Sequence, residues 1–267
     1  MFSFLSNMYI DLHAHLDLYS EKDIEDKIKN AEKAGLKAVV GSGICPESSR
    51  KILALAEKYK IVKAAIGLYP IDALAAEKSE EGILPDKIPE TDIDSEIRFI
   101  RQNKDKIIAI GEIGLDYKTG KDKEAQQKLF RQMLCLAVEL KKPVIIHSRK
   151  AEADVIEILE EYKDKIRIIM HCFCGKKKLM IRAINNRWHF TIPTHVVKSE
   201  QHQFLAKNTP LSRLFCETDS PFLSPFPEKE NEPAFVVESY KKIAELKGME
   251  LKEVANNIFL NYQRLFS

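Results

Sequence analysis

The sequence Asp11-Leu-His-Ala-His15 contains two histidines one residue apart, directly after a short apolar stretch at 8–10 that is typical of a β-strand. Side chains in a strand repeat every two residues, so His13 and His15 are expected on one face, together with Asp11. Their backbones would lie about 6.5–7 Å apart, close enough for both imidazoles to converge on one ion. A pair of structural histidines explains this spacing equally well.

Four further residues with metal-binding side chains each lie at the end of a predicted strand: Glu112, His147, His171 and Asp219. Imidazoles and carboxylates together suit zinc, manganese or nickel, whereas magnesium prefers oxygen ligands. Six ligands exceed the four of a tetrahedral ion and fit two ions about 3.5–4 Å apart with a bridging group. Each residue taken alone is more often a cap or core residue, and it is their joint occurrence that favours a metal site.

Glu112 is the expected bridge, because its two carboxylate oxygens can each bind one ion. The six ligands then divide into one set for each ion: His13, His15, Glu112 and Asp219 for the first, and Glu112, His147 and His171 for the second. Asp219 is also placed to accept a proton from water as a general base. Glu217, two residues earlier on the same face, either orients a ligand or belongs to a buried polar network.

The elements that must position these residues alternate along the chain. Apolar runs predict eight strands at about 8–13, 36–40, 61–66, 107–110, 143–147, 166–171, 188–192 and 213–217. Other segments predict helices at about 21–34, 46–59, 92–103, 122–141, 151–162, 176–186, 199–207, 233–247 and 251–265. The proline-containing segment 71–90 is predicted to be a long surface loop.

Eight strands that alternate with helices in about 260 residues predict an α/β protein, namely a (β/α)8 TIM barrel with additional C-terminal helices. In that fold the carboxyl ends of the strands surround one mouth, where all six candidate ligands would meet. A doubly wound sheet is the alternative fold, and it would spread the same strand ends along an open edge.

Composition sets the broad class of the protein. The chain has 267 residues, of which 45% are hydrophobic, and we expect a single domain over 1–267 with residues 1–7 as a short N-terminal extension. A net charge of +2 gives no strong overall field, so a site for a polyanion must be local. No apolar run is long enough for a membrane span, and residues 1–7 do not form a convincing signal peptide. Five cysteines, an odd number, indicate reduced thiols and a cytoplasmic location.

Basic residues cluster after the strands that carry the candidate ligands. Arg149 and Lys150 follow His147, and lysines also lie at 118, 121, 123 and 176–178. The guanidinium group of Arg149 has the geometry to bind a phosphate with two parallel hydrogen bonds. Lysine runs at helix starts are more often solvated, so Arg149 is the stronger candidate for substrate binding.

Five motifs resemble the TatD-type deoxyribonucleases in order and spacing: Asp11-Leu-His-Ala-His15, Gly111-Glu-Ile-Gly-Leu-Asp-Tyr117, Ile146-His-Ser-Arg149, His171-Cys-Phe173 and Glu217-Thr-Asp-Ser-Pro221. The resemblance covers about residues 8–266 and includes Asn231-Glu-Pro233. It implies a TIM barrel of the amidohydrolase type and metal-dependent DNA hydrolysis, typically exonucleolytic from a 3′ end. It also implies two divalent metals held by His13, His15, Glu112, His147, His171 and Asp219.

The sequence differs from the family pattern in three places. Tyr69 stands where the family usually has His, and Cys174 stands where it usually has Ser. The segment 224–230 is acidic and proline-rich where the family often has a basic stretch. The first and third differences concern phosphate and strand binding and leave the metal ligands unchanged. Because a Tyr hydroxyl stays neutral at working pH, we expect Tyr69 to engage a phosphate more weakly than a histidine would.

We therefore expect a hydrolase that uses two divalent ions (Zn, Mn, Mg or Ni) to cleave phosphodiester bonds of DNA, as a 3′–5′ exonuclease on single-stranded ends. Asp219 and Glu112 would be catalytic, and Arg149 and Tyr69 would contact the substrate. Neither a membrane nor an obligatory protein partner is expected. Two alternatives are an amidohydrolase-like enzyme for a small ester, lactone or amide, and a metal-binding protein with little turnover. The presence of both Glu112 and Asp219 argues against the last.

Overall fold

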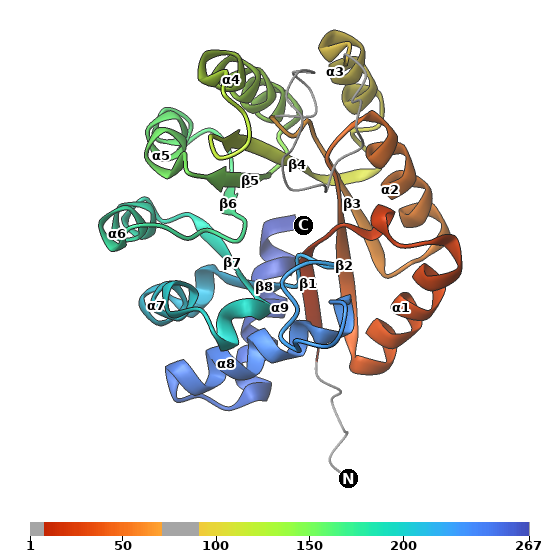
Figure 1. Cartoon of the computed structure of the whole chain (residues 1–267), viewed down its shortest axis with the longest axis vertical. Helices are drawn as coiled ribbons and strands as arrows, with labels where there is room; N and C mark the ends of the chain where they lie inside the picture. The colour runs from red at the N-terminus through yellow and green to blue at the C-terminus, as the bar shows by residue number, and fades with distance from the viewer. Residues whose placement is uncertain (1–7, 71–90, 267) are drawn as a thin grey trace.

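The computed structural model describes residues 8–70 and 91–266. The predicted N-terminal extension and the predicted loop 71–90 therefore lie outside the described residues. Within them, eight parallel strands form one sheet in chain order (Figure 1). The strands are β1 (Tyr9–Ala14), β2 (Leu36–Gly43), β3 (Val62–Ile66), β4 (Ile107–Asp116), β5 (Val144–Arg149), β6 (Ile168–Met170), β7 (His189–Pro193) and β8 (Leu214–Glu217).

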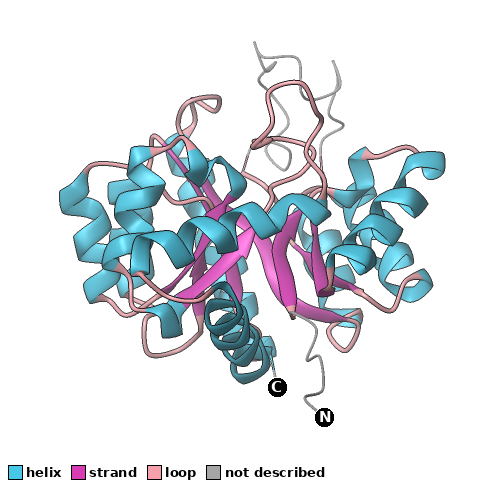
Figure 2. Cartoon of the chain, turned by 90° about the horizontal axis from the view of Figure 1, so that it is seen from below, coloured by secondary structure: helices cyan, strands magenta, loops and turns pink. Residues whose placement is uncertain are grey.

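Helices connect successive strands and surround them on the outside, as Figure 2 shows. The α-helices are α1 (Glu21–Ala34), α2 (Pro46–Lys58), α3 (Ile93–Gln102), α4 (Lys123–Leu140), α5 (Glu152–Glu160), α6 (Lys177–Asn185), α7 (Glu200–Asn208), α8 (Val237–Lys247) and α9 (Leu251–Phe266). Four short 3₁₀ turns are η1 (Leu16–Leu18), η2 (Thr194–Val197), η3 (Leu211–Arg213) and η4 (Pro233–Val236). The helix predicted at 233–247 is thus divided into η4 and α8.

The sheet closes on itself where β1 meets the chain that follows β8. Ala14 forms a parallel bridge with Ser220, and the backbone N–H of His15 donates to the carbonyl of Ser220 over 2.8 Å. One residue earlier, the N–H of Asp219 donates to the carbonyl of His13 over 2.9 Å. This closure confirms the predicted (β/α)8 barrel and excludes the open doubly wound sheet.

Helix starts follow the capping rules expected from the sequence. Short side chains at Ser20, Asp92, Asp122 and Ser199 accept the backbone N–H three residues on, which satisfies one of the free donors of each helix. Pro46 lies in the first turn of α2, as predicted. The sheet and the inner helix faces supply the apolar core, and side chains such as Val39, Val144 and Ile169 are fully buried.

The predicted end of the fourth strand was wrong, because β4 continues from 110 to Asp116 and contains Glu112. Glycines that indicated a strand end allow β4 to pass close to β5 instead. A Cβ atom at Gly114 would lie 2.0 Å from the carbonyl oxygen of His147, and Gly114 has a φ of 150°, which only glycine adopts readily. β5 likewise runs past His147 to Arg149, whereas β6 ends before His171.

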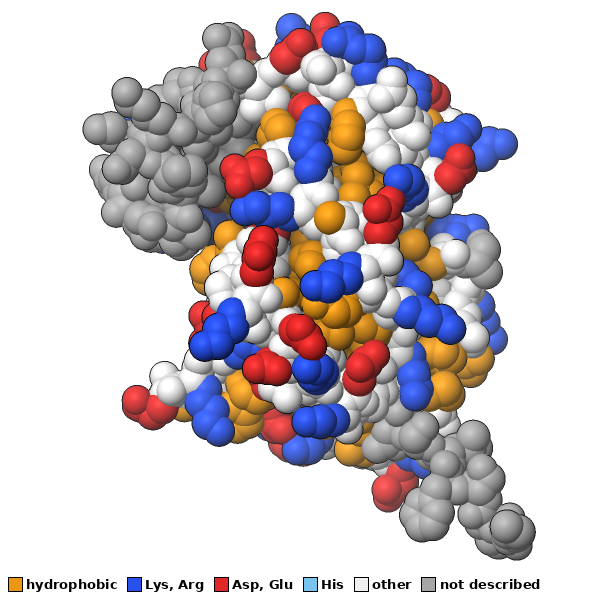
Figure 3. Space-filling view, turned by 90° about the vertical axis from the view of Figure 1, so that its right-hand side faces the viewer, with side chains coloured by type: hydrophobic (Ala, Val, Ile, Leu, Met, Phe, Trp, Pro, Cys, Tyr) orange, Lys and Arg blue, Asp and Glu red, His pale blue; other side chains and the backbone are white. Residues whose placement is uncertain are grey.

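The surface over α1 and α2 carries both signs of charge. Figure 3 shows Lys and Arg interspersed with Asp and Glu on this side of the molecule, and ion pairs one helical turn apart join Glu25 to Lys29 and Glu47 to Lys51. This mixture agrees with the small net charge. Among the described residues no helix is long and apolar enough to span a membrane, and all five cysteines are free thiols.

Buried side chains lock the seam between β1 and β8. The carboxylate of Asp11 accepts hydrogen bonds from the backbone N–H of Thr218 (2.9 Å) and from its hydroxyl (2.5 Å). Asn231, which is fully buried, shares its amide hydrogens among Thr194 Oγ1 and the carbonyls of Thr218 and Phe222. These bonds hold both ends of the loop that carries Asp219.

We predict that Asn231→Ala will destabilise the fold, because it leaves buried carbonyl groups without a donor. The expected loss in the free energy of unfolding is about 2–3 kcal/mol, the order of magnitude for buried groups that lose their partners. Urea unfolding of the variant checks this. Asn208→Ala is the matched control, since Asn208 is exposed and its amide bonds only the carbonyl of Phe204. Equal midpoints for both variants would contradict the assigned role of Asn231.

The burial of His189 should make the stability of the fold depend on pH. Burial, with the charge of Arg213, lowers the pKa of His189 to about 4, and its buried Nδ1 has no hydrogen-bond partner among the described residues. Between pH 6.5 and 4 the unfolded chain therefore binds a proton that the folded chain does not, so stability falls as the pH falls. The full effect is about 3 kcal/mol for a shift of this size.

The measurement is urea unfolding of the parent and of His189→Gln at pH 7 and pH 4.5. The variant should lose about 2 kcal/mol less than the parent between these values, because glutamine does not titrate. If the parent and His189→Gln lose the same free energy of unfolding between pH 7 and pH 4.5, His189 is not the cause of the pH dependence.

Candidate metal centre

The barrel brings all six predicted ligands to one end of the strands. Each comes from, or directly follows, a different position in the sheet: His13 from β1, His15 after it, Glu112 from β4, His147 from β5, His171 after β6 and Asp219 after β8. Four of the six side chains are at least nine-tenths buried, whereas those of Asp219 and His147 are 15% and 16% exposed. The closure of β1 against β8 is what places Asp219 beside the two histidines of β1.

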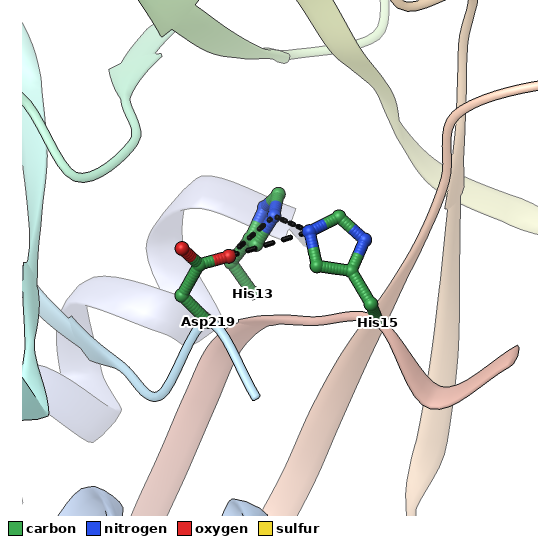
Figure 4. A group of neighbouring side chains, drawn as sticks. All are labelled: His13, His15 and Asp219. Atoms are coloured by element: carbon green, nitrogen blue, oxygen red, sulfur yellow. Dashed lines mark hydrogen bonds and ion pairs between the residues drawn. The ribbon is translucent and has the colours of Figure 1, made fainter. Parts of the chain in front are cut away.

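The first group consists of His13, His15 and Asp219, whose side chains point toward one another in Figure 4. The Nε2 atoms of His13 and His15 lie 3.3 Å apart. Asp219 Oδ1 lies 3.6 Å from Nε2 of His13 and 3.3 Å from Nε2 of His15. Three potential ligand atoms therefore converge on one small volume.

The second group consists of Glu112, His147 and His171. Glu112 Oε1 lies 2.6 Å from Nδ1 of His147 and 3.8 Å from Nε2 of His171. The other oxygen of the same carboxylate, Oε2, lies 3.4 Å from Nε2 of His13 and 3.9 Å from Nε2 of His15. Each oxygen of Glu112 thus faces a different group of imidazoles, which is the arrangement that a bridging ligand requires.

Residues around the ligands orient the imidazole rings. His171 Nδ1 lies 2.7 Å from Glu217 Oε2, and His13 Nδ1 lies 3.0 Å from Ser42 Oγ. In both rings Nδ1 is occupied by a partner and Nε2 faces the site. Of the two alternatives for Glu217, the geometry favours an orienting role, since its carboxylate contacts a candidate ligand. Its second oxygen accepts the backbone N–H of Cys172 over 2.8 Å.

The electrostatics of the site favour bound cations. Burial disfavours the charged form of Glu112, but the neighbouring imidazoles, His147 and His171 foremost, outweigh it and hold the pKa of Glu112 well below its usual range. Burial also opposes ionisation of Asp219, whose pKa is nevertheless lowered, first by His171. For His171 burial is outweighed by the charges of Glu217 and Asp219, which raise its pKa to about 10.

The residues present therefore fit a metal centre. Asp219 Oδ1, which faces Nε2 of both His13 and His15, is a buried atom without a hydrogen-bond partner among the described residues. The crowded Nε2 atoms of His13 and His15 cannot both donate a hydrogen to one another, whereas their lone pairs can bind a shared cation. Imidazole nitrogens mixed with carboxylate oxygens suit zinc, manganese or nickel better than magnesium.

Two contacts of the site were not foreseen from the sequence. Asp116 is buried at the end of β4, and its Oδ2 accepts a hydrogen bond from the hydroxyl of Tyr69 over 2.7 Å. The same hydroxyl lies 3.1 Å from Nε2 of His147. The spacing of Glu112 and Asp116, four residues apart in one strand, could have indicated a common face, but the predicted strand ended at 110.

The predicted substrate-binding residues lie at the same end of the barrel. Tyr69 follows β3, and Arg149 is the last residue of β5, where it pairs in register with Asp116. The side chain of Arg149 is half-buried. Lys177 at the start of α6 packs its ammonium group 5.2 Å from the ring centre of Phe204. The structure thus brings Tyr69 into contact with the candidate ligand His147, and Arg149 lies two residues beyond that ligand in β5.

Known proteins resemble this chain over nearly its whole length. The family model described as TatD related DNase matches residues 10–267. Deoxyribonuclease TATDN3 of Homo sapiens is 32% identical over 264 residues, which cover 96% of this chain and 94% of the human protein. The uncharacterized metal-dependent hydrolase YabD of Bacillus subtilis is 33% identical over 268 residues, which cover 97% of this chain and 99% of YabD.

Solved structures agree with the sequence relatives. The crystal structure of YjjV, a TatD homologue from Escherichia coli, matches with a TM-score of 0.82 and 26% identity, and the match covers 97% of both chains. The fold, the convergence of six ligand side chains and the family match lead to one conclusion. The protein belongs to the TatD-related DNase family and is a metal-dependent hydrolase.

Proposed function

We propose that this hydrolase uses two divalent ions to cleave phosphodiester bonds of DNA, acting as a 3′–5′ exonuclease on single-stranded ends. The observation that carries the proposal is the position of Glu112, whose two oxygens face two separate groups of imidazoles. Six ligands divided in this way exceed the need of one ion. Membership of a DNase family supports DNA as the substrate, and so does the name deoxyribonuclease of the human relative.

The chain's own residues supply binding, orientation and proton transfer in this reaction. Bound divalent ions would activate water and neutralise charge that develops on the phosphate. Asp219, whose carboxylate faces the Nε2 atoms of His13 and His15, accepts the proton that the attacking water loses. Glu217 and Ser42 hold the rings of His171 and His13 so that Nε2 of each faces the site. Arg149 at the end of β5 binds the phosphate with its guanidinium group.

The sequence also predicted a cytoplasmic location and a single domain over 1–267, and both remain part of the proposal. Five free thiols support the first, because oxidising compartments favour disulfides. One continuous barrel with its own core supports the second. A small ester, lactone or amide remains the alternative class of substrate, since this type of barrel supports many hydrolyses.

The test of function is incubation of the purified, metal-loaded protein with DNA oligonucleotides. Single strands labelled at the 5′ end should shorten stepwise when Mn²⁺, Mg²⁺, Zn²⁺ or Ni²⁺ is present. A phosphorothioate linkage at the 3′ end of the strand should block this shortening. Parallel assays with small esters, lactones and amides test the alternative class. If the protein hydrolyses these small compounds but leaves the DNA uncleaved, the nuclease proposal is overturned.

We predict about two divalent ions per chain and a loss of metal in Glu112→Gln. The amide has one oxygen and no charge, so it cannot join two ions as the carboxylate can. Elemental analysis after reconstitution and desalting should find two ions in the parent and one or none in the variant. Glu124→Gln, which changes an exposed glutamate of α4, is the control and should keep the parent content. One ion or fewer in the parent would remove the two-metal hypothesis.

We predict that Asp219→Asn will abolish most hydrolysis while the fold persists. Loss of the proton acceptor alone costs on the order of 10²–10⁴-fold in rate, and loss of a ligand adds to this. The measurement is kcat on labelled DNA, with circular dichroism to check the fold and Asp105→Asn, at an exposed residue, as the control. If Asp219→Asn keeps near-parental kcat with both ions bound, Asp219 is not the general base.

A further inference from the structure

Tyr69 occupies a fixed position between two strand ends. Its backbone N–H donates to the carbonyl of Ile44 over 2.8 Å, which anchors the turn after β3. Its ring meets the ring of His147 edge-on, with centroids 4.8 Å apart at 66°. Its hydroxyl lies 2.7 Å from Asp116 Oδ2 and 3.1 Å from His147 Nε2. The side chain therefore joins β3, β4 and β5 at the edge of the metal centre.

The hydrogen bonds in this group can run in only one consistent direction. Asp116 Oδ1 accepts the backbone N–H groups of Lys118 (2.9 Å) and Thr119 (3.0 Å), so the carboxylate is an acceptor on both oxygens. Tyr69 has one hydroxyl hydrogen and donates it to Asp116. Its oxygen can then only accept from His147, and Nε2 of His147 must carry the hydrogen.

This direction determines which nitrogen of His147 is available to a metal. A neutral imidazole with hydrogen on Nε2 has its lone pair on Nδ1. In the structure Nδ1 of His147 is the ring nitrogen that faces Glu112, with Oε1 of that carboxylate 2.6 Å away. Without an ion, a hydrogen on Nδ1 bridges this contact to Glu112. Nε2 keeps its own hydrogen toward Tyr69 and Asp116, whose Oδ2 lies 3.5 Å away, so an ion that displaces the Nδ1 hydrogen meets the lone pair of the nitrogen that faces Glu112.

We propose that Tyr69 and Asp116 are positioning residues that fix the tautomer and ring orientation of His147, so that Nδ1 binds the second ion. The inference rests on the two-ion site proposed above, and it adds two residues that determine which nitrogen of His147 binds the ion. Partners of this kind commonly alter metal affinity by about 10–100-fold when they are removed.

The geometry also bears on the substrate contact predicted for Tyr69. A phosphate oxygen is an acceptor, and the only hydrogen of the Tyr69 hydroxyl is donated to Asp116. To donate a hydrogen bond to a phosphate, Tyr69 would have to give up its hydrogen bond to Asp116. The series of hydrogen bonds from Asp116 through Tyr69 to His147 would then be broken. A role in positioning His147 and a role in binding phosphate therefore make different predictions for the same variants.

The first experiment measures metal affinity without turnover. Zn²⁺ or Mn²⁺ is titrated calorimetrically into the metal-free parent, Tyr69→Phe and Asp116→Asn, and His147→Ala identifies which binding step belongs to the second ion. Tyr69→Phe should weaken that step about 10–100-fold and leave the other step unchanged. Asp116→Asn should weaken the same step, because its amide turns a donor toward Tyr69. Tyr117→Phe is the matched control, since Tyr117 contacts Asp154 and Gln127 instead of a candidate ligand.

The outcomes separate this inference from the proposed function. If the parent binds two ions and Tyr69→Phe binds both with parental affinity, the positioning role is overturned while the two-metal proposal stands. A raised KM for DNA in Tyr69→Phe with unchanged metal binding also overturns it and assigns Tyr69 to the substrate. A parent that binds fewer than two ions overturns both.

A second measurement reads the tautomer directly. Long-range ¹H–¹⁵N correlation spectra of the zinc-loaded, ¹⁵N-labelled protein report which ring nitrogen of each histidine carries hydrogen, and His147→Ala assigns the signal. We expect His147 with hydrogen on Nε2 and zinc on Nδ1. Hydrogen on Nδ1 would overturn the inference.

Discussion

A carboxylate buried among imidazoles is the interaction on which the rest of this structure depends. Glu112 is only 3% exposed, and an isolated charge so deeply buried would be very costly. It is tolerated because histidines from β1, β5 and the end of β6 lie within 4 Å of its two oxygens. The imidazoles that stabilise this anion in the absence of a metal are also ligands for metal cations. The site is therefore preorganised by electrostatics as well as by the backbone.

This requirement explains why the barrel must close. Glu112 lies in β4 and Asp219 follows β8, four strands apart in the sheet order, and both must reach His13 and His15. In an open sheet β8 would be an edge, far from β1. The seam bonds from Asp11 to Thr218 and from Asp219 to His13 remove that edge and set the distance between the two halves of the first ligand group. The stability of the seam and the geometry of the metal centre are thus one property.

Much of this architecture could be predicted from the sequence, because its signals are local. Apolar runs and caps indicated all eight strands and the helices, and alternation within β1 placed His13 and His15 on one face. The family resemblance is confirmed by the family model. The extent of β4 was not predicted, because Gly111 and Gly114 also suit a strand end, and only the close approach of β5 explains them. The contacts of Tyr69 with Asp116 and His147 depend on the register of three strands, which no local pattern specifies.

The two ends of the described chain have a consequence for access to the metal centre. β1 begins at the amino end of the sheet, and Leu265 near the end of α9 is held by Arg167, which directly precedes β6. Figure 2 shows the start of β1 and the end of α9 on the same side of the molecule. The metal centre lies at the carboxyl ends of the strands, on the opposite face. Because β1 starts and α9 ends on the face opposite the strand ends that carry the ligands, neither of these two elements restricts access to the mouth of the barrel.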